Sequence, residues 1–314
     1  MTASQVSAPA RLRLRRPKRR GYPRTMRDTT RPVQVVRAQS DGGHIEFARR
    51  EPSPGLLPYV RDVCGYTERT GAPLQRREFP GPQVVVILEF APPIRVFEAG
   101  CTHRSARYPG GFAAGITDQF TLTQHDGFQR GLQINLTPIG ARRFFGLPLS
   151  ELAGRAVSIR DLLPAEHRSL AEQLEAMADW EARFDCVEEL LARRIAGSDR
   201  RSEVVPWALR YIEACGGAAD MRMLARELGY SQKHVIHLFR DQVGVPPKLL
   251  ARIVRFNRLI GSLRRGAPES WSELALAFGY YDQSHLVRDV HQFTGTTPTE
   301  ARAMLANSPD PGPW

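Results

Sequence analysis

The sequence predicts an α+β fold. An N-terminal β-rich domain with covering helices is followed by a C-terminal all-α domain with two helix-turn-helix motifs joined by a connecting helix. Two observations predict this fold. Short runs of β-forming residues, separated by Gly and Pro, occupy residues 34–135. Residues 219–303 then carry nearly the same helical pattern twice. The chain of 314 residues is long enough for two domains, each with its own core.

The first 31 residues carry most of the excess positive charge. They contain ten Arg and Lys residues and one acidic residue, and the net charge of the whole chain is +11. A segment this charged and this poor in apolar residues buries too little surface to fold, so we expect residues 1–31 to be a disordered basic tail. Two interpretations stay open: a non-specific DNA-binding arm, or a solvated segment that precedes a true start at Met26. The basic run is not followed by the apolar run of a signal peptide.

A series of short strands is predicted next. The last of them is the clearest, because Leu132, Ile134 and Leu136 alternate with polar residues as in a half-buried strand. The predicted strands are residues 33–38, 44–49, 83–90, 94–98, 112–116, 119–124 and 128–136. Several short strands at this spacing are typical of a small barrel or a double sheet. The longest apolar run, residues 84–88, is far too short to span a membrane, so we expect a cytoplasmic protein without a membrane partner.

The chain is predicted to become helical after Pro138. We expect a short helix at residues 139–145 and two amphipathic helices at residues 165–180 and 185–196. Two roles for the longer helices stay open, since they could cover the β domain or pair with another subunit in a homodimer. The predicted segments are a β-rich domain at 32–196, a polar linker at 197–202, a helical domain at 203–306 and a tail at 307–314.

Both copies of the repeat have the residues of a helix-turn-helix. In each copy a short helix ends at a glycine, Gly229 or Gly279, which adopts the left-handed conformation without steric cost. A residue able to cap a second helix follows, Ser231 in the first copy and Asp282 in the second. Two helices joined in this way form the arrangement that places the second helix in the DNA major groove. Helix packing alone also uses such turns, but the duplication with caps in register favours DNA binding.

The segments that flank these turns support the same interpretation. Asp220 can cap the first leading helix, and the sequence from Ser270 to Glu273 has the form of a capping box before the second. We expect one connecting helix between the copies, at residues 247–263. Residues 222–265 contain ten basic side chains and two acidic ones, which is the local positive charge that binding to a phosphate backbone requires.

The sequence lacks the patterns of a metal site or of a catalytic site. The four cysteines are widely separated, at Cys64, Cys101, Cys186 and Cys215. Three histidines of the β domain are also scattered, at His44, His103 and His125. Neither set has the spacing of metal ligands, and the chain has no glycine-rich phosphate loop and no convincing nucleophile–base pair. We therefore expect no metal, no cofactor and no enzymatic activity.

The C-terminal hundred residues resemble the AraC/XylS family of bacterial transcription regulators. The residues that carry the resemblance are Leu224-Ala225, Gly229-Tyr230-Ser231, Leu238-Phe239-Arg240, Gly244-Val245-Pro246-Pro247, Arg255, Ala277, Gly279-Tyr280, Ser284-His285-Leu286, Arg288, Gly295 and Pro298. Three positions depart from the family pattern: Ile236 stands where a polar residue is frequent, Leu259 where Ala is common, and Val290 where Phe is usual.

The resemblance implies a function and a set of partners. It implies a cupin-like N-terminal domain that senses a small-molecule effector or mediates dimerisation, and a C-terminal domain that binds promoter DNA. It further implies a regulator, most often an activator, that contacts RNA polymerase. Two alternatives stay open: a β-domain enzyme fused to a helical targeting module, and a protein-interaction module without DNA binding.

The helical period assigns the residues expected to face DNA. They lie opposite the buried side of each second helix. They are Gln232, Lys233, Ile236, His237 and Arg240 in the first motif, and Gln283, Ser284, Val287 and Arg288 in the second. Gln can bond adenine, Arg can bond guanine, and the two apolar side chains can pack on a thymine methyl group.

Overall fold

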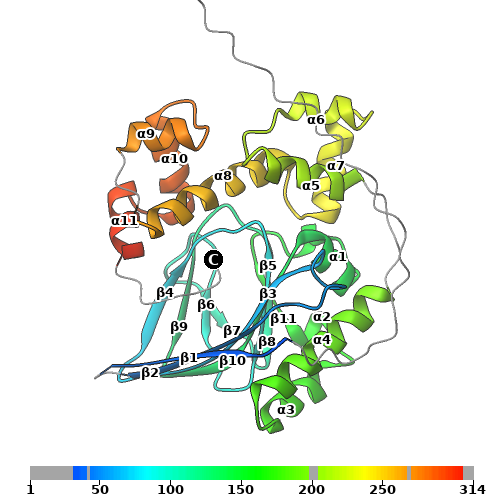
Figure 1. The fold of residues 1–314 in the computed structure, drawn as a ribbon, viewed down its shortest axis with the longest axis vertical. Coiled ribbons are helices and arrows are strands. Elements are labelled where there is room, and N and C mark those ends of the chain that lie inside the picture. The colour runs from blue at the N-terminus through cyan, green and yellow to red at the C-terminus, as the bar shows by residue number, and fades with distance from the viewer. Residues whose placement is uncertain (1–30, 41–42, 198–203, 267–269, 307–314) are drawn as a thin grey trace, which may run out of the picture.

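The structure, a computed structural model, describes residues 31–40, 43–197, 204–266 and 270–306. Figure 1 shows a β-rich part and a helical part, with the long helix α8 (Pro247–Arg264) running over the end of the β strands. Nearly all of the predicted basic tail, most of the predicted linker and the predicted C-terminal tail lie outside the described residues.

The β-rich part consists of two antiparallel sheets, which confirms the predicted β domain. The large sheet holds, in spatial order, β1 (Gln34–Ser40), β2 (Gly43–Arg50), β3 (Val60–Thr70), β10 (Phe128–Leu136), β5 (Val84–Glu89), β8 (Gly111–Ala114) and β11 (Ala156–Ser158). The small sheet holds β4 (Leu74–Glu78), β9 (Thr121–His125), β6 (Arg95–Phe97) and β7 (Ser105–Arg107). Four of these strands, β3, β4, β7 and β11, were not predicted from the sequence.

The large sheet has two faces with different surroundings, because successive side chains of a strand point to opposite sides. In β10, Leu132 and Ile134 are buried in the main apolar core together with residues of the covering helices. Gln133, between them, lines a cavity that the large sheet shares with the small one. Tyr66 and Glu68 of β3 line the same cavity. The sheet therefore has an apolar helix-covered face and a mixed cavity-lining face.

Helices pack against the outer face of the large sheet. They are α1 (Pro138–Phe145), the 3₁₀ turn η1 (Leu149–Glu151), α2 (Ile159–Leu162), α3 (His167–Ala176) and α4 (Trp180–Ala196). The prediction of one helix over residues 165–180 was wrong. The helix ends at Ala176, and Asp179 starts the next one because its carboxylate accepts a hydrogen bond from the N–H of Ala182 at 2.8 Å. The helix predicted to begin at residue 185 therefore begins at Trp180.

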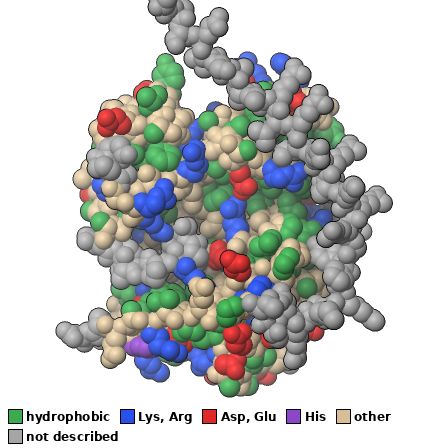
Figure 2. Space-filling model, in the orientation of Figure 1, with side chains coloured by type: hydrophobic (Ala, Val, Ile, Leu, Met, Phe, Trp, Pro, Cys, Tyr) green, Lys and Arg blue, Asp and Glu red, His purple; other side chains and the backbone are tan. Residues whose placement is uncertain are grey.

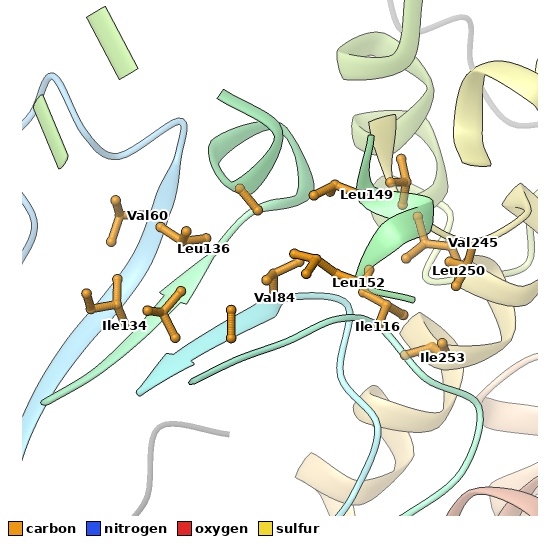
Figure 3. Close-up of a cluster of buried hydrophobic side chains, with 14 of the residues drawn as sticks. Val60, Val84, Ile116, Ile134, Leu136, Leu149, Leu152, Val245, Leu250 and Ile253 are labelled. Carbon is orange, nitrogen blue, oxygen red and sulfur yellow. The ribbon is translucent and has the colours of Figure 1, made fainter. Parts of the chain in front are cut away.

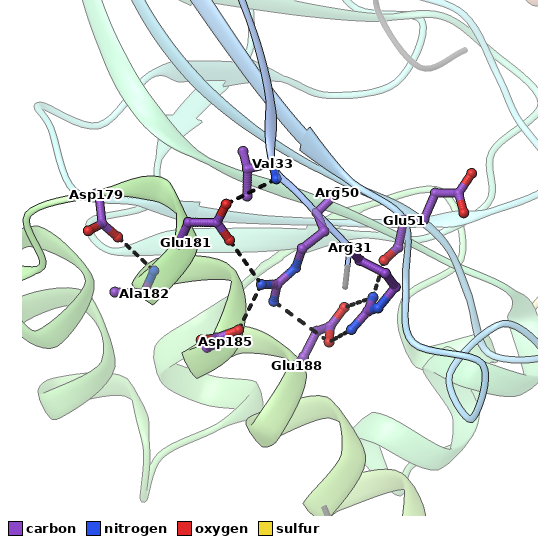
Figure 4. Close-up of polar contacts among 9 residues, drawn as sticks. All are labelled: Arg31, Val33, Arg50, Glu51, Asp179, Glu181, Ala182, Asp185 and Glu188. Atoms are coloured by element: carbon purple, nitrogen blue, oxygen red, sulfur yellow. Dashed lines mark hydrogen bonds and ion pairs between the residues drawn. The ribbon is translucent and has the colours of Figure 1, made fainter. Parts of the chain in front are cut away.

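Ionic contacts attach α4 to the start of the large sheet (Figure 4). Arg50 of β2, with an almost fully buried side chain, lies 2.7 Å from a carboxylate oxygen of Asp185 and 3.5 Å from one of Glu181. Arg31 pairs with Glu188 through two hydrogen bonds of 2.9 and 3.0 Å. Because a bidentate Arg–carboxylate pair fixes both position and orientation, these contacts hold α4 in one register on the sheet.

The helical part has the predicted architecture. Its helices are α5 (Val204–Ala214), α6 (Met221–Glu227), α7 (Gln232–Gln242), α8, α9 (Trp271–Ala277), α10 (Gln283–Thr294) and α11 (Pro298–Ala306). The first helix-turn-helix is α6 and α7, the second is α9 and α10, and α8 is the connecting helix. Figure 1 shows the two motifs at opposite ends of α8.

The β-rich part and the helical part share one apolar core. Leu149 and Leu152 of the β-rich part belong to the same buried cluster as Val245, Leu250 and Ile253 of the helical part. Figure 3 shows these side chains converging where η1 meets the end of the first helix-turn-helix and the start of α8. The orientation of the first motif relative to the β domain is therefore fixed by side-chain packing.

A buried carboxyl group in β5 leads to a testable prediction about pH. Burial raises the pKa of Glu89 from 4.5 to about 7, although the N–H of Ile94 and the charge of Arg107 oppose the shift. The unfolded chain ionises this group near 4.5, so the folded state loses stability as the pH rises from about 4.5 to about 7. We expect Glu89→Gln to be more stable than the unmodified chain by about 2 kcal/mol at pH 8.5 and nearly equal at pH 4.5. Urea unfolding at both pH values checks this. An equal difference in unfolding free energy between variant and unmodified chain at the two pH values would contradict it.

Among the described residues, no helix has both the length and the apolar composition needed to cross a membrane.

Candidate DNA-binding surface

The two helix-turn-helix motifs are built by the same local interactions. Gly229 and Gly279 adopt left-handed φ angles of 70° and 72°, as the turn requires. The Ser231 hydroxyl accepts a hydrogen bond from the N–H of His234 at 3.2 Å, and the Asp282 carboxylate accepts one from the N–H of His285 at 2.7 Å. The predicted capping side chains therefore start both recognition helices, α7 and α10.

The leading helices are also capped as predicted. The Asp220 carboxylate accepts hydrogen bonds from the N–H groups of Arg222 and Met223, and these bonds lower the pKa of Asp220. Ser270 and Glu273 form a complete capping box at the start of α9, and the hydrogen bonds from Ser270 lower the pKa of Glu273. Both carboxylates lie at helix N-termini, where the helix dipole favours negative charge.

All nine predicted DNA-facing residues are exposed on the two recognition helices. They are Gln232, Lys233, Ile236, His237 and Arg240 on α7, and Gln283, Ser284, Val287 and Arg288 on α10. Ile236 is 37% exposed and Val287 is 36% exposed, and the offset of 51 residues makes them equivalent. Two equivalent apolar side chains on exposed helix faces fit a role in contacting a surface that carries methyl groups, such as the thymines of a major groove.

Two of these residues on α10 have intramolecular hydrogen bonds. The Ser272 hydroxyl donates to the Gln283 side-chain oxygen at 2.7 Å, and the Arg288 Nε donates to the Ser284 carbonyl oxygen at 3.3 Å. The Gln283 contact joins the two helices of the motif. The hydrogen bond of Arg288 is long and uses only Nε, and the side chain is exposed. A bidentate contact of its guanidinium group to a base would therefore need little rearrangement.

Three exposed residues near α10 were missed by the sequence analysis. His291 occupies the position equivalent to Arg240 and is exposed, and the offset of 51 residues was the signal that could have identified it. Leu276 is 83% exposed and Tyr281 is 92% exposed, although both are large and apolar. The sequence pattern gave no signal for these two, because large apolar side chains are ordinarily expected in a core.

Basic side chains occur around both motifs. Figure 2 shows blue Lys and Arg side chains at several places over the helical part of the molecule. Some of the arginines on the connecting helix make intramolecular contacts. Arg255 donates to the Gly217 carbonyl oxygen at 3.0 Å, and Arg258 donates to the Gly216 carbonyl oxygen at 3.3 Å. These two therefore tie α8 to the loop after α5, which accounts for part of the local positive charge.

A chain of hydrogen bonds attaches α10 to α8 and to the β domain. Asp289, buried in α10, accepts hydrogen bonds from Arg252 of α8 at 2.7 and 3.1 Å. Arg252 also donates to the Gln292 side-chain oxygen at 2.7 Å. Gln292 in turn donates to Asp118, in the loop before β9, at 2.8 Å. Because these hydrogen bonds join three parts of the chain, they hold the second recognition helix in a defined orientation.

The β domain contacts both recognition helices at equivalent positions. Asp241 of α7 and Gln292 of α10 are equivalent at the offset of 51 residues, and they contact Arg142 and Asp118 of the β-rich part. The glycines that follow the two helices, Gly244 and Gly295, are equivalent as well. Both lie close to the β domain. A Cβ atom at Gly244 would approach the Leu149 carbonyl oxygen, and a Cβ atom at Gly295 would collide with the Phe120 ring. The β domain therefore fixes both motifs from the side opposite their exposed faces.

The cavity between the two sheets has a volume of about 600 Å³. One part of its lining is an apolar cluster of Ile87, Ile94, Val96 and Phe112. Its wall also includes Phe79 and Pro80, which contact the connecting helix: the Phe79 ring lies 6.2 Å from the Phe256 ring, and the Pro80 carbonyl oxygen accepts a hydrogen bond from Asn257 at 2.6 Å. The cavity wall and the connecting helix are thus in direct contact.

Two charged groups inside the cavity, Arg76 and Glu68, are paired with each other. Arg76 of β4 donates two hydrogen bonds to the Glu68 carboxylate, at 2.6 and 2.8 Å, and Gln129 donates a third. Burial raises the pKa of Glu68, but the hydrogen bonds from His125 and Arg76 outweigh it and lower the pKa to about 2. Glu68 is therefore ionised and neutralised by Arg76. The described residues contain no group of three His, Cys, Asp or Glu side chains placed to hold a metal ion.

Comparisons with known proteins agree with this geometry. A family described as a helix-turn-helix domain matches residues 224–304, and a family described as a domain of unknown function matches residues 48–158. No curated protein sequence matches the chain significantly.

Several solved structures are similar to the chain. ToxT from Vibrio cholerae is 11% identical, with 75% of this chain and 99% of that chain covered and a TM-score of 0.41. A transcriptional regulator with an AraC-type DNA-binding domain from Chromobacterium violaceum is 25% identical, with 33% and 91% covered and a TM-score of 0.30. The C-terminal domain of AraT, a response regulator from Geobacillus stearothermophilus, is 19% identical, with 37% and 97% covered and a TM-score of 0.32. The helix-turn-helix match over residues 224–304 agrees with the duplicated motif and its connecting helix, and this part of the chain resembles the DNA-binding domain of AraC/XylS transcription regulators.

Proposed function

We propose that the chain is a sequence-specific transcription activator that inserts α7 and α10 into successive major grooves on one face of promoter DNA. The observation that carries this proposal is the equivalence of the two recognition helices: both expose their predicted DNA-facing residues and both are capped and anchored at equivalent positions. Activation through contact with RNA polymerase is what the family resemblance implies.

We further propose that the β domain modulates DNA binding in response to a small molecule. Support comes from three contacts between the cavity region and the helical part. Phe79 and Pro80, in the cavity wall, contact α8, and Arg77, next to the cavity-lining Arg76, donates to the Thr294 carbonyl oxygen at the end of α10 at 2.8 Å. A ligand that moves β4 or the segment after it would displace contacts to both α8 and α10, and so change the relative placement of the two recognition helices.

The salt dependence of DNA affinity tests DNA binding itself. Because phosphate neutralisation releases counterions, we expect the dissociation constant for a duplex of random sequence to rise by about 10³-fold or more between 50 and 200 mM salt. Fluorescence anisotropy of a labelled duplex measures this. Absence of binding at the lowest salt concentration would contradict the proposal and favour a protein-interaction module.

A further inference from the structure

The cavity of the β domain has a lining that selects a class of ligand. Part of the lining is the apolar cluster of Ile87, Ile94, Val96 and Phe112. Aromatic rings, including that of Tyr66, also line the wall. Aromatic side chains in such a wall favour ring-containing ligands through stacked and edge-to-face contacts. A volume of about 600 Å³ is in the range of small-molecule sites.

The charges around the cavity disfavour anions. Among the described residues that line it, the guanidinium groups are those of Arg76 and Arg155, and the carboxylates are those of Glu68, Glu78 and Glu98. Arg76 is neutralised by Glu68, and Arg155 is exposed, with its Nε bonded to the Glu151 carbonyl oxygen. An anion that entered the apolar cluster would leave water and find there no buried cation that is not already paired with a carboxylate.

We propose that this cavity binds an uncharged, largely apolar aromatic molecule and excludes anions of the same shape. The inference rests on the proposed function, because it names the class of effector through which the β domain would act. The selectivity depends on one ion pair, because Glu68 neutralises the guanidinium group of Arg76.

A pair of dyes with one skeleton tests the proposal on the full chain without DNA. N-phenyl-1-naphthylamine is uncharged, and 1-anilinonaphthalene-8-sulfonate is the same molecule with a sulfonate; both fluoresce more strongly in apolar surroundings. Burial of a sulfonate without a counterion has an unfavourable desolvation energy. We therefore expect the dissociation constant of the sulfonate dye to be about tenfold or more above that of the uncharged dye. Equal affinity for both dyes, or tighter binding of the sulfonate, would overturn the proposal.

Two variants place the bound dye in the cavity. Ala114→Trp on β8 adds an indole beside the apolar cluster and should weaken binding of the uncharged dye by about tenfold or more, since it occupies part of the cavity. Ala38→Trp, on the exposed strand β1, is the control and should leave the affinity unchanged. If both variants bind the dye as the unmodified chain does, the dye sits elsewhere and the assignment fails.

A charge variant tests the reason for the selectivity. Glu68→Gln removes the carboxylate that neutralises Arg76, so the sulfonate dye should bind about tenfold more tightly than it does to the unmodified chain. Glu68→Gln combined with Arg76→Gln removes the guanidinium group together with its carboxylate partner and should return the original preference. Should the single variant fail to fold, the comparison of the two dyes on the unmodified chain still decides. If the chain does not bind the uncharged dye, the proposed ligand class is wrong, but the proposal of DNA binding is unaffected. If the chain does not bind DNA, the dye measurements can still be interpreted.

Discussion

Replacing Phe256 with alanine is expected to lower the free energy of unfolding by about 3–5 kcal/mol, because a fully buried aromatic side chain is lost and a cavity remains. Phe256 lies in the middle of α8. Its ring is 4.9 Å from the Phe293 ring of α10 and 6.2 Å from the Phe79 ring of the β domain. The residue therefore packs simultaneously against the second recognition helix and the cavity wall.

Urea unfolding measures this loss, and a second variant makes it specific. Phe79→Ala and the double variant Phe79→Ala/Phe256→Ala complete a cycle in which the coupling between the two rings is expected to be about 0.5–1.5 kcal/mol. A loss below about 1 kcal/mol for Phe256→Ala would contradict the account of α8 as a shared core element. A coupling near zero would contradict the contact between the β domain and α8.

Arg288→Ala should weaken binding to a specific site by about 1–3 kcal/mol and relax the preference at one base pair, because a bidentate contact to guanine would be lost. Arg288 is exposed on α10, and its guanidinium group has one long hydrogen bond to its own helix. Loss of a contact to phosphate would weaken all sequences equally instead. The measurement is the affinity for the selected site and for its single-base variants.

Arg104→Ala is the matched control for this experiment. Arg104 is an exposed arginine of the β domain that pairs with Glu98 at 2.9 Å, so its loss removes the same charge from a residue outside the two motifs. Its affinity and base preference should equal those of the unmodified chain. If Arg288→Ala also leaves both unchanged, Arg288 has no part in base recognition and α7 is the main reading helix.

The helical part could be predicted from the sequence because its signals are local. Glycines at the turns and capping residues such as Ser231 and Asp282 act within four residues of themselves, and the duplication showed each signal twice. Four strands of the β domain, β3, β4, β7 and β11, were not predicted from the sequence. The strand β3 contains Gly65 and several charged residues, and it forms because Gly65 lets the Trp180 ring of α4 approach and because Glu68 pairs with Arg76 of another sheet.

The same distinction applies to the sites. Exposure of the nine residues on α7 and α10 follows from helix periodicity, so the sequence placed them correctly on the outer faces. The cavity depends on strands from both sheets, and the contacts of Asp241 with Arg142 and of Gln292 with Asp118 join residues distant in the chain. A local sequence pattern cannot predict contacts between residues that are distant in the chain.

Selection of binding sites from random double-stranded DNA tests the central claim most directly. Two recognition helices held in one orientation should select two short specified segments whose centres lie about one helical turn, roughly 34 Å, apart. Substitution of Lys233 should then alter only the segment read by α7, and substitution of Arg288 only the segment read by α10. Enrichment of a single segment, or of no sequence at all, would contradict the account.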